Sequence, residues 1–454
     1  MLSKYRFWIV LGSMLIGIVL VVQAQDNPPL SQPTIDAAVS TLIAQTQQPQ
    51  MMATQTIQAA LFQALTATAV AQTAQPTPMA QPTQTAPSTA ATIENFDASH
   101  LTVAGTTDID LLAGPTGTSA YLAPDGSRFA YFKQKKICLY AGDQQQNCID
   151  LSDKLSNIDS ETIRWSPDSR YIAFTEEFFR SFRDPDIWVL DTTDMTATDL
   201  TDDGVKNIEI SDNDWKNIDV FPRWTQDDQI IFLRYGRSSG QITSPEIHRI
   251  APDGSGDTVL GTVNDYDEPF SIYSLDVGNN NQLAYGFAAQ RSSPSDGVWI
   301  SDLDGKNAHQ LTHESDQGII TNVQFSPDSR YVLVNAEQKA PLPNPTPAAS
   351  RMYVVDSSSG KVSLIDPDHY VTGAGWSPEG SALVYITHND LDPSNPDAVF
   401  LTNAAGSPGQ QLTSLQGKFN IATPLLRTTL SWGKNNTILL SNSPGTGIVL
   451  VHLQ

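Results

Sequence analysis

The residues best suited to chemistry are histidines that lie close to acidic side chains. Histidine nitrogens and carboxylate oxygens are common ligands of transition metals in proteins. In an extended strand His309 and His313, with Glu314, would share one face and could hold a metal ion. The alternative interpretation is an exposed strand and its loop, without a metal, and we favour it because the remaining histidines are scattered along the chain.

The other patterns that could carry catalysis are weak. The acidic segment HNDLDPSNPD, residues 388–397, offers the oxygen ligands that Ca²⁺ prefers, but its acids lack the spacing of a defined calcium loop. No serine stands in a nucleophile-elbow motif, and no glycine-rich loop of the phosphate-cradling kind is present. We therefore expect no enzyme, no catalytic residue, no metal and no cofactor.

Three segments instead combine aromatic and charged side chains as binding surfaces do. They are EEFFRSFRDPD at 176–186, DDGVKNIEISDNDWKNID at 202–219 and GTVNDYDEP at 261–269. Aromatic and arginine side chains supply most anchors of protein interfaces. The predicted partner-binding residues are Phe178, Phe179, Arg180, Phe182, Arg183, Trp215 and Tyr266. The alternative for the phenylalanines is that they extend a strand or fold back onto the domain.

The negative net charge of the chain argues against one class of partner, nucleic acid. The chain has 26 Lys and Arg against 49 Asp and Glu, and its formal net charge is −23 at pH 7. A field of that sign repels phosphate backbones, so nucleic acid is not expected as a partner. A protein or a glycan remains, and we expect a monomeric domain.

An internal repeat provides the frame for these segments. IRWSPDSRYIAF begins at Ile163 and VQFSPDSRYVLV begins at Val323, with related copies elsewhere between residues 120 and 442. Seven copies recur about every 50 residues, a period that is typical of propeller blades. One copy, at 273–287, is degenerate, so a six-bladed ring is the alternative if that copy is an insertion.

Each repeat contains signals for four antiparallel strands. A short strand ends in an aromatic residue, Ser-Pro-Asp makes a tight turn, and alternating strands follow, separated by Asp-Gly or Ser-Gly turns. The last repeat ends with the chain at its third strand, while Asp108–Gly114 resembles a fourth strand without a blade. We therefore predict an all-β, seven-bladed β-propeller that is closed by an N-terminal strand.

Several repeated residues have structural explanations. We expect the indole rings at the end of the first strands to pack between adjacent blades; these are Trp165, Trp224, Trp376 and Trp432. We expect Asp125, Asp168 and Asp328 to form turns and not to act as catalytic carboxylates.

The two cysteines, Cys138 and Cys148, lie symmetrically about Asp143 in a segment that reads as a hairpin. They either form a cross-strand disulfide or are two small buried residues. A disulfide would be compatible with a location outside the cytoplasm.

The N-terminus carries export signals. Lys4 and Arg6 precede an apolar run from Phe7 to Val22, and the sequence that follows resembles a cleavage site after Ala24. Residues 1–24 are therefore a signal peptide or a signal anchor, and the propeller at 101–454 is secreted or tethered to the cytoplasmic membrane. Residues 25–100 are rich in Gln, Thr, Ala and Pro and are predicted to be a disordered stalk.

Topology should divide the connections between two faces. We call one the turn face: it carries the connections between first and second strands and between third and fourth strands, which are short and stereotyped. The opposite loop face carries the connections between second and third strands and between blades, which are longer and irregular. Variable loops on a rigid frame are where binding residues concentrate.

The repeats WSPDSRYIAF and FSPDSRYVLV, with third strands such as DIWVLD, resemble those of TolB-like propellers over residues 108–454. This resemblance implies an extracytoplasmic scaffold of the cell envelope that binds a partner. TolB has a small α/β domain where this chain has the stalk, so TolB's own complex does not carry over.

The predicted function is thus a non-catalytic scaffold that binds a protein or glycan through the loop face. Two alternatives remain. One is a passive structural spacer of the envelope. The other is a metal-dependent enzyme like the propeller-type polysaccharide lyases, in which His248, His313 and His388 would converge on a metal.

Overall fold

All regular secondary structure in the described part of the chain is β-strand. The computed structural model describes residues 101–109, 118–155, 157–176, 185–205, 216–238, 241–264, 270–288, 293–313, 319–337, 350–366, 370–388, 398–402, 409–414, 428–442 and 448–454. These residues belong to one compact unit, Thr85–Gln454. A search of the same residues finds no helix that could cross a membrane.

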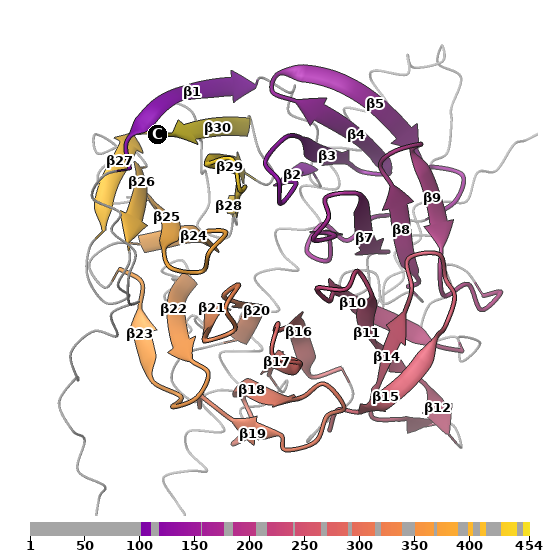
Figure 1. Cartoon of the computed structure of the whole chain (residues 1–454). Coiled ribbons are helices and arrows are strands. Elements are labelled where there is room, and N and C mark those ends of the chain that lie inside the picture. The colour runs from indigo at the N-terminus through magenta and orange to yellow at the C-terminus, as the bar shows by residue number, and fades with distance from the viewer. Residues whose placement is uncertain are drawn as a thin grey trace, which may run out of the picture. The chain divides into compact units, whose positions relative to one another are not determined.

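Seven four-stranded antiparallel sheets form the blades of a propeller (Figure 1). The strands of blades 1 to 3 are β2 (Thr118–Leu122), β3 (Phe129–Lys133), β4 (Lys136–Ala141), β5 (Gln144–Asp150); β6 (Arg164–Trp165), β7 (Tyr171–Thr175), β8 (Ile187–Asp191), β9 (Thr196–Asp199); β10 (Ile218–Trp224), β11 (Ile230–Tyr235), β14 (Glu246–Ile250) and β15 (Thr258–Thr262). A small hairpin, β12 (Arg237–Ser238) and β13 (Gln241–Ile242), interrupts blade 3 between its second and third strands.

Blades 4 to 6 follow the same order. Their strands are β16 (Ile272–Val277), β17 (Gln282–Phe287), β18 (Gly297–Asp302), β19 (His309–Gln310); β20 (Ile319–Phe325), β21 (Tyr331–Glu337), β22 (Ser350–Asp356), β23 (Val362–Leu364); β24 (Tyr370–Trp376), β25 (Leu383–His388), β26 (Ala398–Thr402) and β27 (Gln410–Ser414). The degenerate repeat forms β16 and β17 of a complete blade, so the seven-bladed prediction is confirmed and the six-bladed alternative is wrong.

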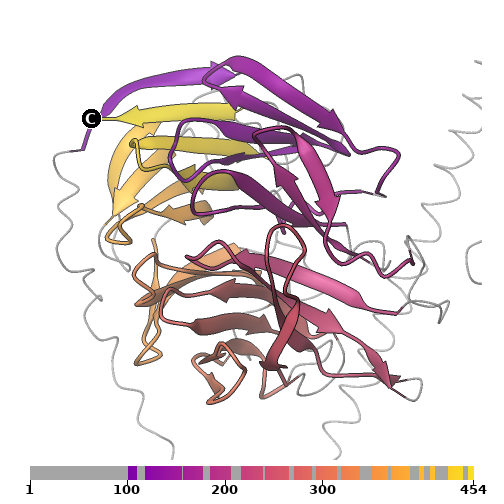
Figure 2. The same ribbon diagram turned by 45° about the vertical axis from the view of Figure 1, so that its right-hand side comes forward.

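Blade 7 joins the two ends of the propeller. It consists of β28 (Thr428–Trp432), β29 (Thr437–Asn442) and β30 (Ile448–Leu453), with β1 (Val103–Ile109) as its outer strand. Figures 1 and 2 show β1 beside β30, close to the C-terminus. Closure by an N-terminal strand is therefore confirmed.

The bounds predicted for the closing strand were wrong. We expected Asp108–Gly114, but the paired strand starts five residues earlier, at Val103, and its last pair is Ile109 with Ile448. Thr102 extends the pairing by exchanging two backbone hydrogen bonds with Gln454, at 2.9 and 3.1 Å. The prediction selected the segment with more apolar residues. An outer strand pairs through its backbone groups, however, so it needs only alternating burial of its side chains.

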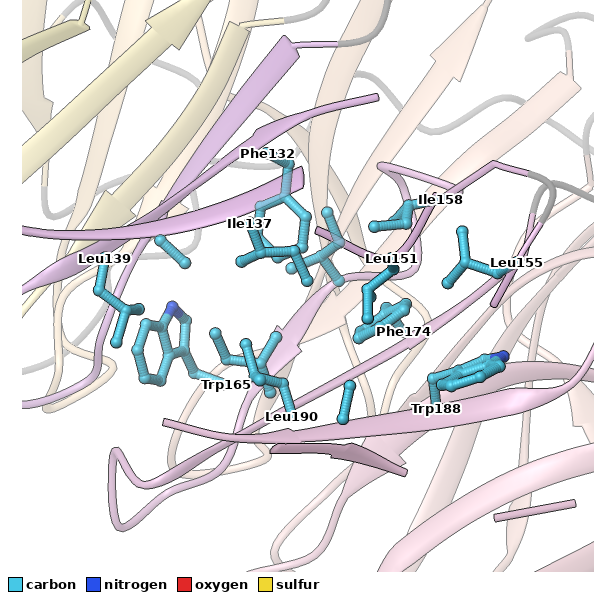
Figure 3. Packing of buried hydrophobic residues seen from close by; sticks show 14 of the residues in the cluster. Phe132, Ile137, Leu139, Leu151, Leu155, Ile158, Trp165, Phe174, Trp188 and Leu190 are labelled. Atoms are coloured by element: carbon cyan, nitrogen blue, oxygen red, sulfur yellow. The ribbon is translucent and has the colours of Figure 1, made fainter. Parts of the chain in front are cut away.

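The hydrophobic core lies between neighbouring blades. One cluster combines Phe132 and Ile137 of blade 1 with Phe174 and Leu190 of blade 2 (Figure 3). The rings of Phe132 and Phe174 meet edge to face, with centroids 6.4 Å apart. Each blade is thus buried against the next on both faces, which explains why alternating apolar residues recur in every repeat.

The repeated tryptophans connect adjacent blades, as predicted. The indole Nε1 of Trp165 donates to the carbonyl of Tyr121 at 2.9 Å, and Trp224 donates to Arg164 at 2.9 Å. Trp376 makes the equivalent bond to Gln324 at 3.4 Å. Trp432 packs against blade 6. The first strands of blades 2, 3 and 6 are therefore held in register against the first strands of the preceding blades.

We expect Trp165→Phe to lower the free energy of unfolding by about 1–2 kcal/mol more than Trp432→Phe does. Both changes remove the same atoms, but only Trp165 donates a hydrogen bond, whereas Nε1 of Trp432 has no partner among the described residues. Urea unfolding of the two variants measures the difference. Equal losses would mean that the inter-blade hydrogen bond contributes nothing.

The anchor aspartates form turns, as predicted. Asp168 Oδ1 accepts the backbone N–H of Arg170 at 2.9 Å, and Asp328 Oδ1 accepts that of Arg330 at 3.1 Å. Each turn includes a residue with positive φ, at Ser169 (63°) and the equivalent Ser329 (58°). The carboxylate compensates this unfavourable conformation by pairing an amide of the turn.

Cys138 and Cys148 are cross-strand partners in β4 and β5 and form a disulfide. The connecting turn includes Asp143, as the symmetry of the segment indicates. The bridge ties the outer strand of blade 1 to the rest of its sheet.

We expect the double variant Cys138→Ser/Cys148→Ser to lose about 2–3 kcal/mol of stability, because the bridge restricts the unfolded chain. Thermal unfolding of the wild-type protein with and without a thiol reductant measures the same quantity independently. A variant that unfolds at the wild-type temperature, with no effect of reductant on either protein, would contradict the prediction.

Candidate functional site

The strand order places two kinds of connection on opposite faces of the propeller. In blade 2, the turn-face connections are residues 166–170 and 192–195. The loop-face connections are residues 176–186, between the second and third strands, and 200–217, which lead to blade 3. Blades 3, 4 and 6 show the same contrast, whereas the loop-face connections 134–135 in blade 1, 365–369 after blade 5 and 443–447 in blade 7 are as short as turn-face connections. The predicted difference between the two faces is therefore present in the structure.

The residues predicted to bind a partner fall on loop-face connections, but outside the described residues. They are Phe178, Phe179, Arg180, Phe182, Arg183, Trp215 and Tyr266. The acidic segment at 389–397 and Glu314 also lie outside the described residues. Their roles stay predictions.

The three histidines that a lyase-type metal site would need, His248, His313 and His388, lie in separate blades. His309 and His313 are both exposed at the outer edge of blade 4, while His248 is buried in blade 3 and His388 ends β25 in blade 6. Over the described ranges, no group of three or more His, Cys, Asp or Glu is placed to hold a metal ion.

A network of charged side chains in blade 3 contacts both ring nitrogens of His248. Arg234 donates to both oxygens of Asp219, at 2.7 and 2.9 Å, and to Oδ2 of Asp257 at 3.1 Å. Oδ1 of Asp257 lies 2.7 Å from Nδ1 of His248, and Oε2 of Glu246 lies 3.3 Å from Nε2. Burial raises the pKa of Asp219, and Arg234 acts against this rise. Both ring nitrogens of His248 are thus engaged inside the blade.

A second set of polar residues lies where the first strands surround the centre of the propeller (Figure 1). The repeat alignment places the residue directly before the anchor position at an equivalent point of each first strand, and the tryptophan hydrogen bonds show this register for Tyr121, Arg164 and Gln324. We call these seven residues the central ring: Tyr121, Arg164, Arg223, Asp276, Gln324, Gly375 and Ser431.

Arg223 and Asp276 form an ion pair within the central ring, in which Arg223 is buried and Asp276 is partly exposed. Arg223 is 3% exposed, and its Nε lies 3.5 Å from Oδ1 of Asp276. Oδ2 of Asp276 accepts the backbone N–H of Phe325, in blade 5, at 2.7 Å. One carboxylate therefore links three consecutive blades.

Burial disfavours the charged forms of both Arg223 and Asp276. Burial lowers the pKa of Arg223 well below its ordinary value, and the neighbouring positive charge of Arg164 lowers it further. Burial raises the pKa of Asp276, against the opposing effect of Arg223. Groups whose charged forms are penalised in this way concentrate at functional sites, although structural ion pairs show it too.

Sequence reasoning missed the central ring. The available signal was the dipeptide Arg-Trp, which occurs at 164–165 and again at 223–224. The sequence analysis assigned the tryptophans to packing and gave the arginines before them no role. Only the register of neighbouring blades shows that the two arginines hold equivalent positions in adjacent first strands.

Comparisons with known proteins agree on the architecture. No family model matches the chain, and no curated protein matches its sequence. An oligogalacturonate lyase in complex with manganese is similar in structure, with a TM-score of 0.50, 11% identity, and coverage of 77% of this chain and 96% of that chain. An oligogalacturonate lyase from Vibrio parahaemolyticus has a TM-score of 0.50, 9% identity, and coverage of 78% and 97%.

A protein assigned as TolB from Agrobacterium tumefaciens has a TM-score of 0.37 and 13% identity, and the match covers 55% of this chain and 81% of that chain. At such identities the likeness concerns the fold alone. Residues 101–454 form a seven-bladed β-propeller, and its fold is similar to that of the two oligogalacturonate lyases.

Proposed function

We propose that this chain is an exported, non-catalytic scaffold that binds a protein or glycan partner through the loop face of its propeller. The observation that carries the proposal is the contrast between the two faces. The turn-face connections are short and capped by side chains such as Asp168, whereas the loop face carries longer connections on the same frame. Binding residues concentrate on such loops because the frame positions them without constraining their sequence.

The disulfide supports the export part of the proposal. Cys138 and Cys148 are bonded, and such bridges persist mainly in oxidising compartments outside the cytoplasm. The basic residues and apolar run at 1–24 are the matching signal in the sequence. The chain is then secreted, or remains tethered to the cytoplasmic membrane if residues 1–24 are retained.

The frame is rigid enough to serve as a scaffold. Tryptophan hydrogen bonds connect blades 1 to 2, 2 to 3 and 5 to 6, and the core is continuous from blade to blade. Loops held by such a frame lose little conformational freedom when they bind, which favours affinity.

Affinity capture from an envelope extract, followed by a binding measurement with the purified partner, tests this function. We expect Phe179→Ala/Arg183→Ala to weaken the interaction at least tenfold while the thermal unfolding temperature stays unchanged. Arg330→Ala, on the turn face, is the control and should bind like the wild type.

Metal analysis of the same samples separates the alternatives. Binding that the loop variant does not affect would reject the loop face as the binding surface. A stoichiometric transition metal that survives dialysis, without a partner, would instead support a metal-dependent enzyme of the lyase type. A folded protein with neither partner nor metal would support a passive spacer.

A further inference from the structure

The central ring places two positive charges next to each other in a strongly acidic protein. Of its seven positions, Arg164 in blade 2 and Arg223 in blade 3 are basic and Asp276 in blade 4 is acidic. The chain as a whole carries a net charge of −23. Two adjacent guanidinium groups near the axis are therefore a local exception to the charge of the molecule.

Contacts link four consecutive blades at this point. Trp224, next to Arg223, donates from its indole Nε1 to the carbonyl of Arg164 at 2.9 Å. Nε of Arg223 lies 3.5 Å from Oδ1 of Asp276, whose Oδ2 accepts the N–H of Phe325 at 2.7 Å. The cluster therefore depends on the packing of blades 2 to 5 and not on any single blade.

The two arginines use few of their hydrogen-bond donors. Within the described part of the chain, Arg223 donates only from Nη1, to the carbonyl of Pro222 at 2.8 Å, and its buried Nε has no hydrogen-bond partner. Arg164 donates only from Nη1, to the carbonyls of Glu161 and Ile163 at 3.0 and 2.7 Å. A guanidinium group has five N–H donors in a planar fork, so most of the donors of both groups are left over.

Solvent reaches the central ring. Gln324 is exposed, and Tyr121, Arg164, Asp276 and Ser431 are partly exposed, although Arg223 is buried. A small anionic group can therefore approach Arg164 from solvent, and Arg223 holds the equivalent position in the neighbouring first strand. A carboxylate suits this place because its two oxygens match the planar fork of a guanidinium group.

We propose that Arg164 and Arg223 form a carboxylate-binding subsite at the centre of the propeller. The group that binds there belongs to a ligand that carries a carboxylate, either an acidic sugar or an acidic peptide. The subsite is separate from the loop-face residues, so it stands or falls independently of the partner binding proposed above.

Titration calorimetry on the full chain tests the subsite with three probes: galacturonate, N-acetylglutamate and inorganic phosphate. We expect one of the two carboxylates to bind, and Arg164→Gln to weaken that binding about tenfold or more, because a charge-assisted hydrogen bond is lost. Arg164→Lys keeps the charge but not the fork, so it should recover only part of the affinity. Arg330→Gln, an exposed arginine on the turn face, is the matched control and should have no effect.

Arg164 is the preferred position because it is partly exposed, so its substitution is compatible with folding. Thermal unfolding of each variant verifies this. Tighter binding of galacturonate assigns the carboxylate to a sugar, and tighter binding of N-acetylglutamate assigns it to a peptide. No binding of either carboxylate, equal or tighter binding of phosphate, or unchanged binding by Arg164→Gln would overturn the proposal.

Discussion

A chain that begins at residue 112, and so lacks β1, is expected to lose on the order of 5 kcal/mol of stability. The outer strand of blade 7 contributes backbone hydrogen bonds to β30 and buries Leu101 and Ile109 in two different core clusters. The stability of a whole domain is only about 5–15 kcal/mol, so this loss should leave much of the protein unfolded at 37 °C. Its β30 edge would also become free to pair with another chain.

A chain that begins at residue 98 is the control, because it removes the preceding segment and keeps β1. Urea unfolding and size-exclusion chromatography compare the two shortened proteins with the full chain. We expect the control to match the full chain and the shorter protein to unfold early or to self-associate. If both shortened proteins remained monomeric and equally stable, closure by β1 would not be what holds the ring together.

The second large effect on stability concerns the ion pair between Arg223 and Asp276 in the central ring. Asp276→Ala is expected to cost about 3–5 kcal/mol, because it leaves the buried guanidinium group of Arg223 without its carboxylate. The double variant Arg223→Met/Asp276→Leu removes both buried charges and should be as stable as the wild type, or more stable by about 1–4 kcal/mol. The two variants thus move stability in opposite directions.

The double variant also separates stability from function. If the pair only supports the fold, its replacement by apolar side chains should leave carboxylate binding unchanged. If the pair belongs to a subsite, the protein should become more stable and lose binding, a trade-off typical of functional sites. Urea unfolding and calorimetry on the same samples measure both quantities. A double variant that is strongly destabilised would show that the pair is needed for folding.

The contribution of Asp276 to the free energy of unfolding changes with pH in a defined direction. Burial raises its pKa in the folded protein, so the folded state binds a proton at this carboxylate more tightly than the unfolded state does. Its contribution to stability is therefore greatest below the unfolded pKa and declines as the pH rises through the folded pKa. Asp276→Asn should remove this dependence, which is seen as a difference between the two proteins in unfolding curves measured across acidic pH.

The repeat pattern was sufficient to predict the blades. Turn formers such as Asp168 and Asp328 act within a few residues, so each hairpin is encoded locally and its sequence signature survives from copy to copy. The tryptophan packing followed for the same reason, because a residue that recurs with the repeat must have the same surroundings in each blade. The count of seven and closure by an N-terminal strand were therefore predictable.

The tertiary structure decided what depends on residues that are far apart in the chain. The register of β1 is set by its partner β30, at the opposite end of the sequence, so composition alone gave the wrong bounds. The contacts of His248 also depend on the fold, which places Asp257 and Glu246 against its two nitrogens. Likewise, Arg164, Arg223 and Asp276 lie in different repeats, and only the packing of consecutive blades brings their strands together. Local chemistry determined the blades, and the packing of blades against one another determined which charges meet at the centre.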